Sequence, residues 1–318
     1  MVPVQGTTMS RKMTDRDLTI RPIRTEDEPV WRQLWAGYLA YYETTLPEKV
    51  CSTTFARLLS GARGEFNGLL AVRQGVPVGL VHFLFHPSSW SVGETCYLQD
   101  LFTLPQARGT GVARALIGAV GAAADAAGAA PVYWFTQDFN ATARHLYDRI
   151  GVLTPFIRYN RRFGDATALP ASVAIRPVVG GDEADWRRLW AAYLTFYQTD
   201  LPEEVTARTF ARVISDDPAT MRGCLLTVDG RAAGLVHFVA HRSCWKVENV
   251  CYLQDLYVDP DLRGRGLGRA LIEAVYAEAD RTGTPAVYWM TASMNTTARL
   301  LYDRVGQPTP FLQYERMP

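Results

Sequence analysis

Two segments of the chain combine an acidic strand with a turn rich in glycine and arginine. They read CYLQDLFTLPQARGTGVARALI from Cys96 and CYLQDLYVDPDLRGRGLGRALI from Cys251. Each turn lies between a strand and a helix start, so several backbone N–H groups can point outward together, and glycine lets ligand oxygens approach the main chain. This geometry favours a phosphate or pyrophosphate site. A turn that needs glycine only for its own shape is the alternative, but two copies in one strand–turn–helix context count against it.

The known nucleotide fingerprints do not fit these two turns. A dinucleotide site requires Gly-x-Gly-x-x-Gly, but Arg114 and Arg269 occupy the last position. The Lys-Ser/Thr pair of the phosphate loop is also missing from both segments. Hydride transfer and phosphoryl transfer from a nucleotide are therefore disfavoured.

A second repeated motif reads NATARHLYDRIG from Asn140 and NTTARLLYDRVG from Asn295. Asn140 and Tyr147 are seven residues apart, close to two helical turns, so both side chains project from one face of a helix. Asn295 and Tyr302 have the same spacing. The alternative is that each tyrosine only belongs to the buried apolar stripe of its helix.

The strand, the Arg-x-x-Gly-x-Gly/Ala turn and the following helix resemble the acetyl-CoA motif of the GNAT acetyltransferases. More narrowly, GLVHFVAHRSCWKVENVCYLQDLYVDPDLRGRGLG and PAVYWMTASMNTTARLLYDRVG are similar to the fungal histone/polyamine and D-amino-acid acetyltransferases. The resemblance covers both halves of the chain almost from end to end. It implies an N-acetyltransferase with acetyl-CoA as cofactor, in which the amine attacks directly within a ternary complex.

The resemblance also implies residue roles. The strand before the turn binds the pantetheine arm through its backbone, the turn amides hold the pyrophosphate, and the motif asparagine binds the cofactor arm. Tyr147 and Tyr302 donate a proton to the departing thiolate, a task that suits a positioned phenol. The implied cofactor-binding residues are Leu101, Phe102, Thr103, Arg108, Gly109, Thr110, Gly111, Val112, Ala113 and Asn140 in the first half, and Leu256, Tyr257, Val258, Arg263, Gly264, Arg265, Gly266, Leu267, Gly268 and Asn295 in the second.

The group that accepts the proton of the amine is less well defined. Asp100 and Asp255 precede the two turns, where a carboxylate could hold an ammonium or relay its proton through water. Many relatives have glutamate one position earlier, but this chain has Gln99 and Gln254, which cannot titrate. His82 and its counterpart 155 residues later are alternative proton acceptors, because imidazole titrates near neutrality. A histidine in a strand is, however, more often a hydrogen-bonded core residue.

The two halves align at one constant offset of 155 residues, as Trp31 and Trp186 illustrate. No gap is needed from about Arg21 to Tyr159. A period this long indicates a duplicated domain and not a solenoid. We predict a flexible tail over 1–17, one domain over 18–162, a linker over 163–172 and a second domain over 173–318.

Each half predicts the same order of elements. A short strand and two helices precede three strands of an antiparallel meander, and then come a helix, a strand, a helix and a last strand. The predicted fold class is α/β (α+β): two tandem GNAT folds, each a mixed, largely antiparallel sheet flanked by helices.

The composition of the chain limits the classes of partner that it is expected to bind. The 33 basic and 32 acidic residues give a net charge of +1, which offers no general attraction to nucleic acid or to an anionic membrane. No apolar run approaches the about 18 residues of a membrane span. The five cysteines lack disulfide or zinc spacing, which predicts no metal and a reducing, cytoplasmic location.

The sequence therefore predicts an enzyme that acetylates a primary amine of a small molecule, such as a polyamine, an amino acid or an amine-bearing antibiotic. The duplication predicts a pseudo-dimer within one chain and leaves further oligomerisation open. The alternative is an acyl-CoA-binding regulatory or scaffolding protein in which one or both halves have lost activity.

Overall fold

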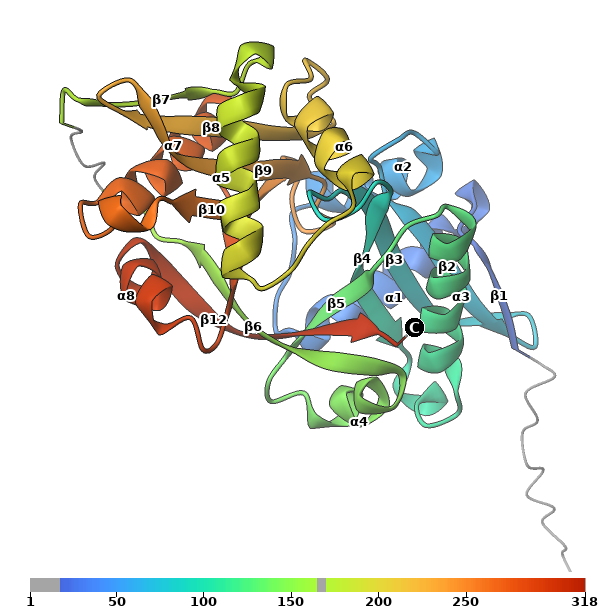
Figure 1. Cartoon of the computed structure of the whole chain (residues 1–318). Coiled ribbons are helices and arrows are strands. Elements are labelled where there is room, and N and C mark those ends of the chain that lie inside the picture. The colour runs from blue at the N-terminus through green and yellow to red at the C-terminus, as the bar shows by residue number, and fades with distance from the viewer. Residues whose placement is uncertain (1–17, 165–169, 318) are drawn as a thin grey trace, which may run out of the picture.

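The computed structural model describes residues 18–164 and 170–317, so the predicted tail and part of the predicted linker lie outside the described residues. Figure 1 shows the two halves, the first in blue to green and the second in yellow to red. The elements of the first half are β1 (Leu18–Pro22), α1 (Glu28–Tyr41), α2 (Glu48–Ser60), β2 (Asn67–Arg73), β3 (Val76–Pro87), β4 (Glu94–Thr103), α3 (Val112–Ala126), β5 (Val132–Gln137), α4 (Ala141–Ile150) and β6 (Gly151–Arg161).

The second half repeats this order element by element. Its helices and strands are β7 (Val173–Pro177), α5 (Glu183–Phe196), α6 (Glu203–Val213), β8 (Met221–Val228), β9 (Arg231–His241), β10 (Val250–Val258), α7 (Leu267–Arg281), β11 (Val287–Ala292), α8 (Thr296–Val305) and β12 (Gly306–Arg316). The predicted order of elements is therefore confirmed in both halves.

The aromatic residues of α1 explain why this helix packs on the sheet. Trp31, Leu34, Trp35 and Tyr38 recur at helical spacing and are all buried, which gives the helix one apolar face toward the core. The matched residues of α5 are buried in the same way. Each first helix is thus held against the meander that carries the acidic residue of its half.

The sheet is continuous across the two halves. The order of its strands is β1-β2-β3-β4-β5-β12-β6-β11-β10-β9-β8-β7. The last strand of each half pairs with the other half, since β12 pairs with β5 and β6 pairs with β11, while β6 and β12 also pair with each other. Figure 1 shows the red β12 running beside β5 and the green β6. The sequence predicts these strands but not the exchange, because their apolar pattern fits either partner equally well.

The exchanged strands bring a tyrosine of one half against the tryptophan and helix tyrosine of the other. Tyr314 of β12 stacks on Trp134 with 6.0 Å between ring centroids and lies 5.5 Å from Tyr147. Its hydroxyl donates to Asp148 at 2.6 Å. The matched contacts of Tyr159 in β6, with Trp289 and Tyr302, anchor the first half in the second.

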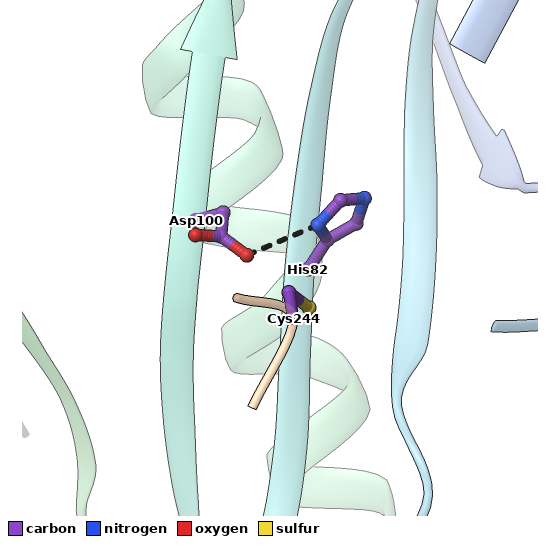
Figure 2. A group of neighbouring side chains, drawn as sticks. All are labelled: His82, Asp100 and Cys244. Atoms are coloured by element: carbon purple, nitrogen blue, oxygen red, sulfur yellow. Dashed lines mark hydrogen bonds and ion pairs between the residues drawn. The ribbon is translucent and has the colours of Figure 1, made fainter. Parts of the chain in front are cut away.

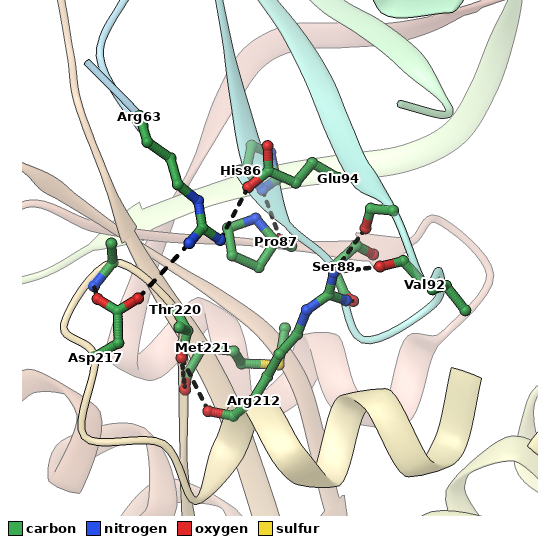
Figure 3. A network of polar contacts seen from close by, with 12 residues as sticks. Arg63, His86, Pro87, Ser88, Val92, Glu94, Arg212, Asp217, Thr220 and Met221 are labelled. Atoms are coloured by element: carbon green, nitrogen blue, oxygen red, sulfur yellow. Dashed lines mark hydrogen bonds and ion pairs between the residues drawn. The ribbon is translucent and has the colours of Figure 1, made fainter. Parts of the chain in front are cut away.

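A buried arginine also joins the halves. Arg212 of α6 donates to the backbone carbonyls of Ser88, Ser91, Val92 and Gly93 at 2.6–2.9 Å, in the loop between β3 and β4. Figure 3 shows the guanidinium reaching across to Ser88 and Val92. These charge-assisted bonds fix the loop of one half on the helix of the other.

Among the described helices, none has the length and apolar character that crossing a membrane would require.

Candidate active site

A bulge in β4 separates that strand from β5 beside the glycine turn. Leu98 pairs with Phe83 and Asp100 pairs with His82, so the residue between them, Gln99, has no partner in the β3 ladder. The parallel pairing of β4 with β5 covers only Cys96–Leu98 and Val132–Trp134. Beyond Leu98 the backbone of Leu101–Thr103 is therefore free of β5 and can bond a ligand between the two strands. The second half has the same bulge at Gln254.

The glycine turn has the backbone conformation that its residues favour. Gly109 and Gly111 have φ of +71° and +87°, and Gly264 and Gly266 have φ of +78° and +80°. Glycine adopts this left-handed region without the penalty that a Cβ brings. Gly111 and Gly266 are the N-caps of α3 and α7, and neither helix start has a side-chain cap. The first N–H groups of both helices can therefore receive an anion.

A pocket of about 540 Å³ lies between the turn, the end of β4 and α4. Its lining contains nearly all the cofactor-binding residues predicted in the first half. These are Leu101, Phe102, Thr103, Arg108, Gly109, Gly111, Val112, Ala113 and Asn140, together with Tyr147. Thr110 does not line the pocket, and its hydroxyl instead accepts from Arg73 at 2.8 Å and donates to the carbonyl of Ala107. The open amides and the splayed strand fit the pyrophosphate and pantetheine arm of coenzyme A.

Asn140 has a structural task in addition to lining this pocket. It is the N-cap of α4, where its Oδ1 accepts the backbone N–H of Ala143 at 3.3 Å and its Nδ2 donates to Thr136. Asn295 caps α8 through Ala298 in the same way. Capping alone therefore accounts for an asparagine at this position, and its contact with the cofactor stays a prediction.

Tyr147 lies at the inner end of the pocket. Its ring contacts Trp134 and Tyr314 and it is buried, and burial raises the pKa of its hydroxyl well above the ordinary value. A phenol with a raised pKa remains protonated at neutral pH, which is the state that a proton donor needs. Burial raises the pKa of Tyr302 as well, between Trp289 and Tyr159.

Asp100 is fully buried in a network that crosses between the halves. Trp31 donates its indole N–H to Nε2 of His82 at 2.9 Å, so the proton of that imidazole is on Nδ1, which donates to Asp100 at 3.1 Å. Trp245 of the second half donates its indole N–H to the other carboxylate oxygen at 2.9 Å. Figure 2 shows His82 and Asp100 on neighbouring strands, with Cys244 beside them on a loop of the second half.

Asp255 has the matched network in the second half. His237 contacts it at 3.0 Å, and Trp90 and Ser89 of the first half both donate to it. Tyr193 donates to the same carboxylate at 3.0 Å. These contacts favour a positioning role for both aspartates, and proton transfer through them stays a prediction.

Cys244, His82 and Asp100 also place a thiol, an imidazole and a carboxylate within 4.8 Å of one another. The polar atoms of His82 and Asp100 already have protein partners, as described above. The residue matched to Cys244 is Ser89, whose hydroxyl donates to Asp255. Both clusters are therefore explained by hydrogen bonding between the halves, in which a weak thiol donor replaces a hydroxyl.

A second pocket of about 600 Å³, here called the acceptor chamber, adjoins the first on the side of α1. The two pockets share Tyr38, Tyr42, Gln99 and Phe135. The chamber is closed by the other half, through the 241–250 loop and the central strands. An acceptor held in the chamber would therefore meet residues of both halves.

The role of Trp245 across the interface is not apparent from the sequence. Its spacing from His241 suggests only a loop contact, because no local pattern indicates that a tryptophan reaches an aspartate 145 residues away. Arg158 lies over the rings of Phe135 and Tyr288 in the chamber. It belongs to none of the motifs in the sequence, so its role is not apparent there either. A difference between the two repeats could have indicated a role for Arg158, since the offset of 155 residues aligns Arg158 with Gln313.

Comparisons with known proteins agree with this geometry. The model of the Acetyltransferase (GNAT) family matches residues 28–152 and 185–307. The D-amino-acid N-acetyltransferase of Saccharomyces cerevisiae is 42% identical over 146 residues, which are 45% of this chain and 90% of that protein. A mycothiol acetyltransferase of Actinosynnema mirum is 31% identical over 260 residues, 79% of this chain and 82% of that protein.

Two solved structures have the same tandem arrangement over nearly the whole chain. A GCN5-related N-acetyltransferase from Sphaerobacter thermophilus superimposes with a TM-score of 0.58 at 17% identity, covering 96% of both chains. A tandem GNAT protein from the clavulanic acid biosynthesis pathway has a TM-score of 0.53 at 16% identity, covering 95% of this chain and 99% of that one. At these identities the likeness shows the fold.

The chain belongs to the GNAT acetyltransferase family and contains two copies of its domain. It is an acyl-CoA-dependent N-acetyltransferase, as the sequence predicted.

Proposed function

We propose that this protein transfers the acetyl group of acetyl-CoA to the primary amine of a small molecule that enters the acceptor chamber. The observation that supports this most is the junction of the two pockets at Tyr38, Tyr42, Gln99 and Phe135. It supports a route by which an acceptor amine reaches the cofactor pocket from the acceptor chamber. The name of the yeast relative fits an amino acid as one such acceptor.

Acetyl-CoA supplies a thioester that an uncharged amine can attack. On this proposal the backbone of Leu101–Thr103 and the N–H groups at the start of α3 hold the cofactor. Tyr147 then donates its phenolic proton to the thiolate that leaves, since Tyr147 lines the same pocket and its hydroxyl stays protonated. The proton that the amine loses on forming the amide passes to water, and solvent returns a proton to the phenolate of Tyr147. Asp100 accepts from His82 and Trp245 and so holds Trp245 in the lining of the acceptor chamber.

The second half retains the bulge, the turn and the buried tyrosine, which supports a second cofactor site. Its turn has Arg265 where the first half has Thr110, so we expect binding at least as tight as in the first half. Isothermal calorimetry should give two molecules of acetyl-CoA per chain. A stoichiometry of one would contradict the proposal for the second half.

The activity is tested by acetyl-CoA turnover against a panel of free amino acids, polyamines, aminoglycosides and histone peptides. We expect a small amine to give the highest kcat/KM. Higher kcat/KM with a histone peptide would overturn the acceptor class, and cofactor binding without turnover of any amine would overturn the function.

A further inference from the structure

Three polar side chains of the acceptor chamber, Gln99, Arg158 and Arg161, have buried atoms without a partner among the described residues. Oε1 of Gln99 accepts no hydrogen bond, although its Nε2 lies 3.5 Å from the hydroxyl of Ser243. Nε of Arg158 makes no hydrogen bond either. A buried polar atom left unpaired costs about 1–3 kcal/mol, so such atoms in a pocket indicate where a ligand completes the bonding.

The chamber has a positive electrostatic character. Its lining includes Arg158, Arg161 and Lys246, and no aspartate or glutamate is among the described residues that line it. Arg161 is paired with Asp280, and desolvation lowers the pKa of His241 to about 3, so that imidazole is neutral at pH 7. Lys246 is exposed to solvent, and the half-buried Arg158 is left as a cation without a carboxylate partner among the residues that the structure describes.

Aromatic rings hold the guanidinium of Arg158 in place. Its central carbon lies 4.3 Å from the ring centroid of Tyr288, 4.9 Å from that of Phe135 and 5.6 Å from that of Phe311. Rings contribute cation–π attraction without neutralising the charge. The guanidinium shares a hydrogen bond with the Tyr97 hydroxyl, and its unpaired Nε–H is available for a planar anion such as a carboxylate.

We propose that the acceptor of this chamber is an amine that also bears a carboxylate, with Arg158 binding the carboxylate and Oε1 of Gln99 accepting a hydrogen bond from the amine. This assignment rests on the function proposed above and specifies its acceptor class. Gln99 lines both pockets, so the amine is held where the cofactor pocket begins. The aromatic lining formed by Tyr38, Tyr42, Phe135 and Trp245 suits an apolar side chain on the acceptor. Polyamines, which carry only positive charge, are disfavoured.

The test compares acceptors that differ only in the carboxylate. Alanine, leucine and phenylalanine are used in both enantiomeric forms, each with its amide and its decarboxylated amine, and putrescine is added as a dication. In the unchanged protein we expect kcat/KM about 10- to 100-fold higher for free amino acids than for the decarboxylated amines. A charge-assisted pair is worth about that much.

Three variants separate recognition from packing. Arg158→Gln, which installs the residue found at the matched position of the second half, should remove that preference mainly through KM and leave the decarboxylated amines within about twofold. Arg158→Lys should restore part of it, because it keeps the charge but loses the fork. Gln99→Ala should lower kcat/KM for every acceptor by a similar factor, because all of them share the amine.

Several outcomes would overturn this assignment. One is an Arg158→Gln variant that loses activity equally with all acceptors, and another is an unchanged protein that prefers putrescine or the decarboxylated amines. Acetyl-CoA binding and thermal unfolding of each variant exclude misfolding as the cause. If amines without a carboxylate are acetylated and amino acids are not, only the acceptor class fails. If no amine is acetylated, the proposed function itself fails.

Discussion

The two halves are alike at the cofactor turn and differ at the strands that cross between them. At matched positions β6 has Arg158 and Asn160, whereas β12 has Gln313 and Glu315. Arg158 presents to the acceptor chamber a cation without a carboxylate partner among the described residues. Glu315 instead accepts from the amide of Gln313 at 3.1 Å, and burial raises the pKa of its carboxyl group.

This difference distinguishes the features that both halves share from the features that are specific to one half. The bulge, the positive-φ glycines and the buried tyrosine occur in both halves, which supports the proposal that both halves bind the same cofactor. The crossing strands are not equivalent, since they differ in charge at these matched positions.

The helix tyrosines test whether both halves are active. Replacing Tyr147 and Tyr302 together by Phe keeps the rings and most of the burial but removes both phenolic protons. General acid catalysis is worth about 10²–10⁴-fold, so we expect kcat to fall at least about tenfold. Each single variant should retain the activity of the unchanged half, and the two residual rates measured with one amine therefore give the share of each half.

Acetyl-CoA binding and thermal unfolding serve as controls for the tyrosine variants. A folded double variant that turns over within about twofold of the parent, with chemistry limiting the rate, would contradict the acid assignment. Water would then protonate the thiolate.

The buried aspartates test whether the interface network positions groups or transfers protons. In Asp100→Asn, the new amide N–H₂ can face the N–H of His82, whose other nitrogen is occupied by Trp31. Breaking a buried charged contact of this kind is strongly destabilising, so we expect a loss of about 3 kcal/mol in the free energy of unfolding by urea. Asp255→Asn should cost at least as much, because Tyr193, Trp90 and Ser89 also donate to that carboxylate. Unchanged stability together with lost turnover would instead support proton transfer.

The interface arginines form a matched pair for the next test. Arg212 donates to four backbone carbonyls of the first half, whereas its counterpart Arg57 donates to those of Lys246 and Val247 only. We expect Arg212→Ala to lower the free energy of unfolding by about 2–3 kcal/mol and Arg57→Ala by about 1–2 kcal/mol. Equal losses would show that the number of carbonyl contacts does not set the strength of the interface.

The smallest expected effect is a dependence of stability on pH. His86 and His241 stack at 5.4 Å across the interface, and burial lowers their pKa values to about 4 and about 3. Their unfolded pKa is about 6.5, so below that pH the unfolded chain binds more protons and stability falls as the pH decreases toward 4. We expect a loss of about 1–2 kcal/mol in urea unfolding between pH 7 and pH 6.

A variant with both histidines replaced by Gln provides the control for that test. It should show a flatter profile over the same range. Glu315 acts in the opposite direction, because its folded pKa is raised, and it is present in both proteins. The difference between the two profiles therefore isolates the histidines, and parallel profiles would contradict the prediction.

Much of the fold followed from local patterns in the sequence. The spacing of Trp31, Trp35 and Tyr38 predicted α1, and the alternation of turns and β-branched residues predicted the meander. The glycine turn was predicted because only glycine accepts φ values such as the +87° of Gly111 without strain. These features depend on residues that are close to one another in the chain, and the spacing of residue types along the sequence is enough to predict them.

The sequence by itself determined the duplication, the order of elements, the glycine turns and the family. Only the tertiary structure shows which half each last strand joins, that Asp100 contacts Trp245, and that Arg158 lies in a chamber whose described lining residues include no aspartate or glutamate. The physical reason is that β6 and β12 have similar apolar patterns and could pair with either half. The choice depends on contacts such as those of Arg212 and Tyr314, between residues more than 100 positions apart. The sequence around each of these residues shows that the side chain is present, but it does not show which distant residue that side chain contacts.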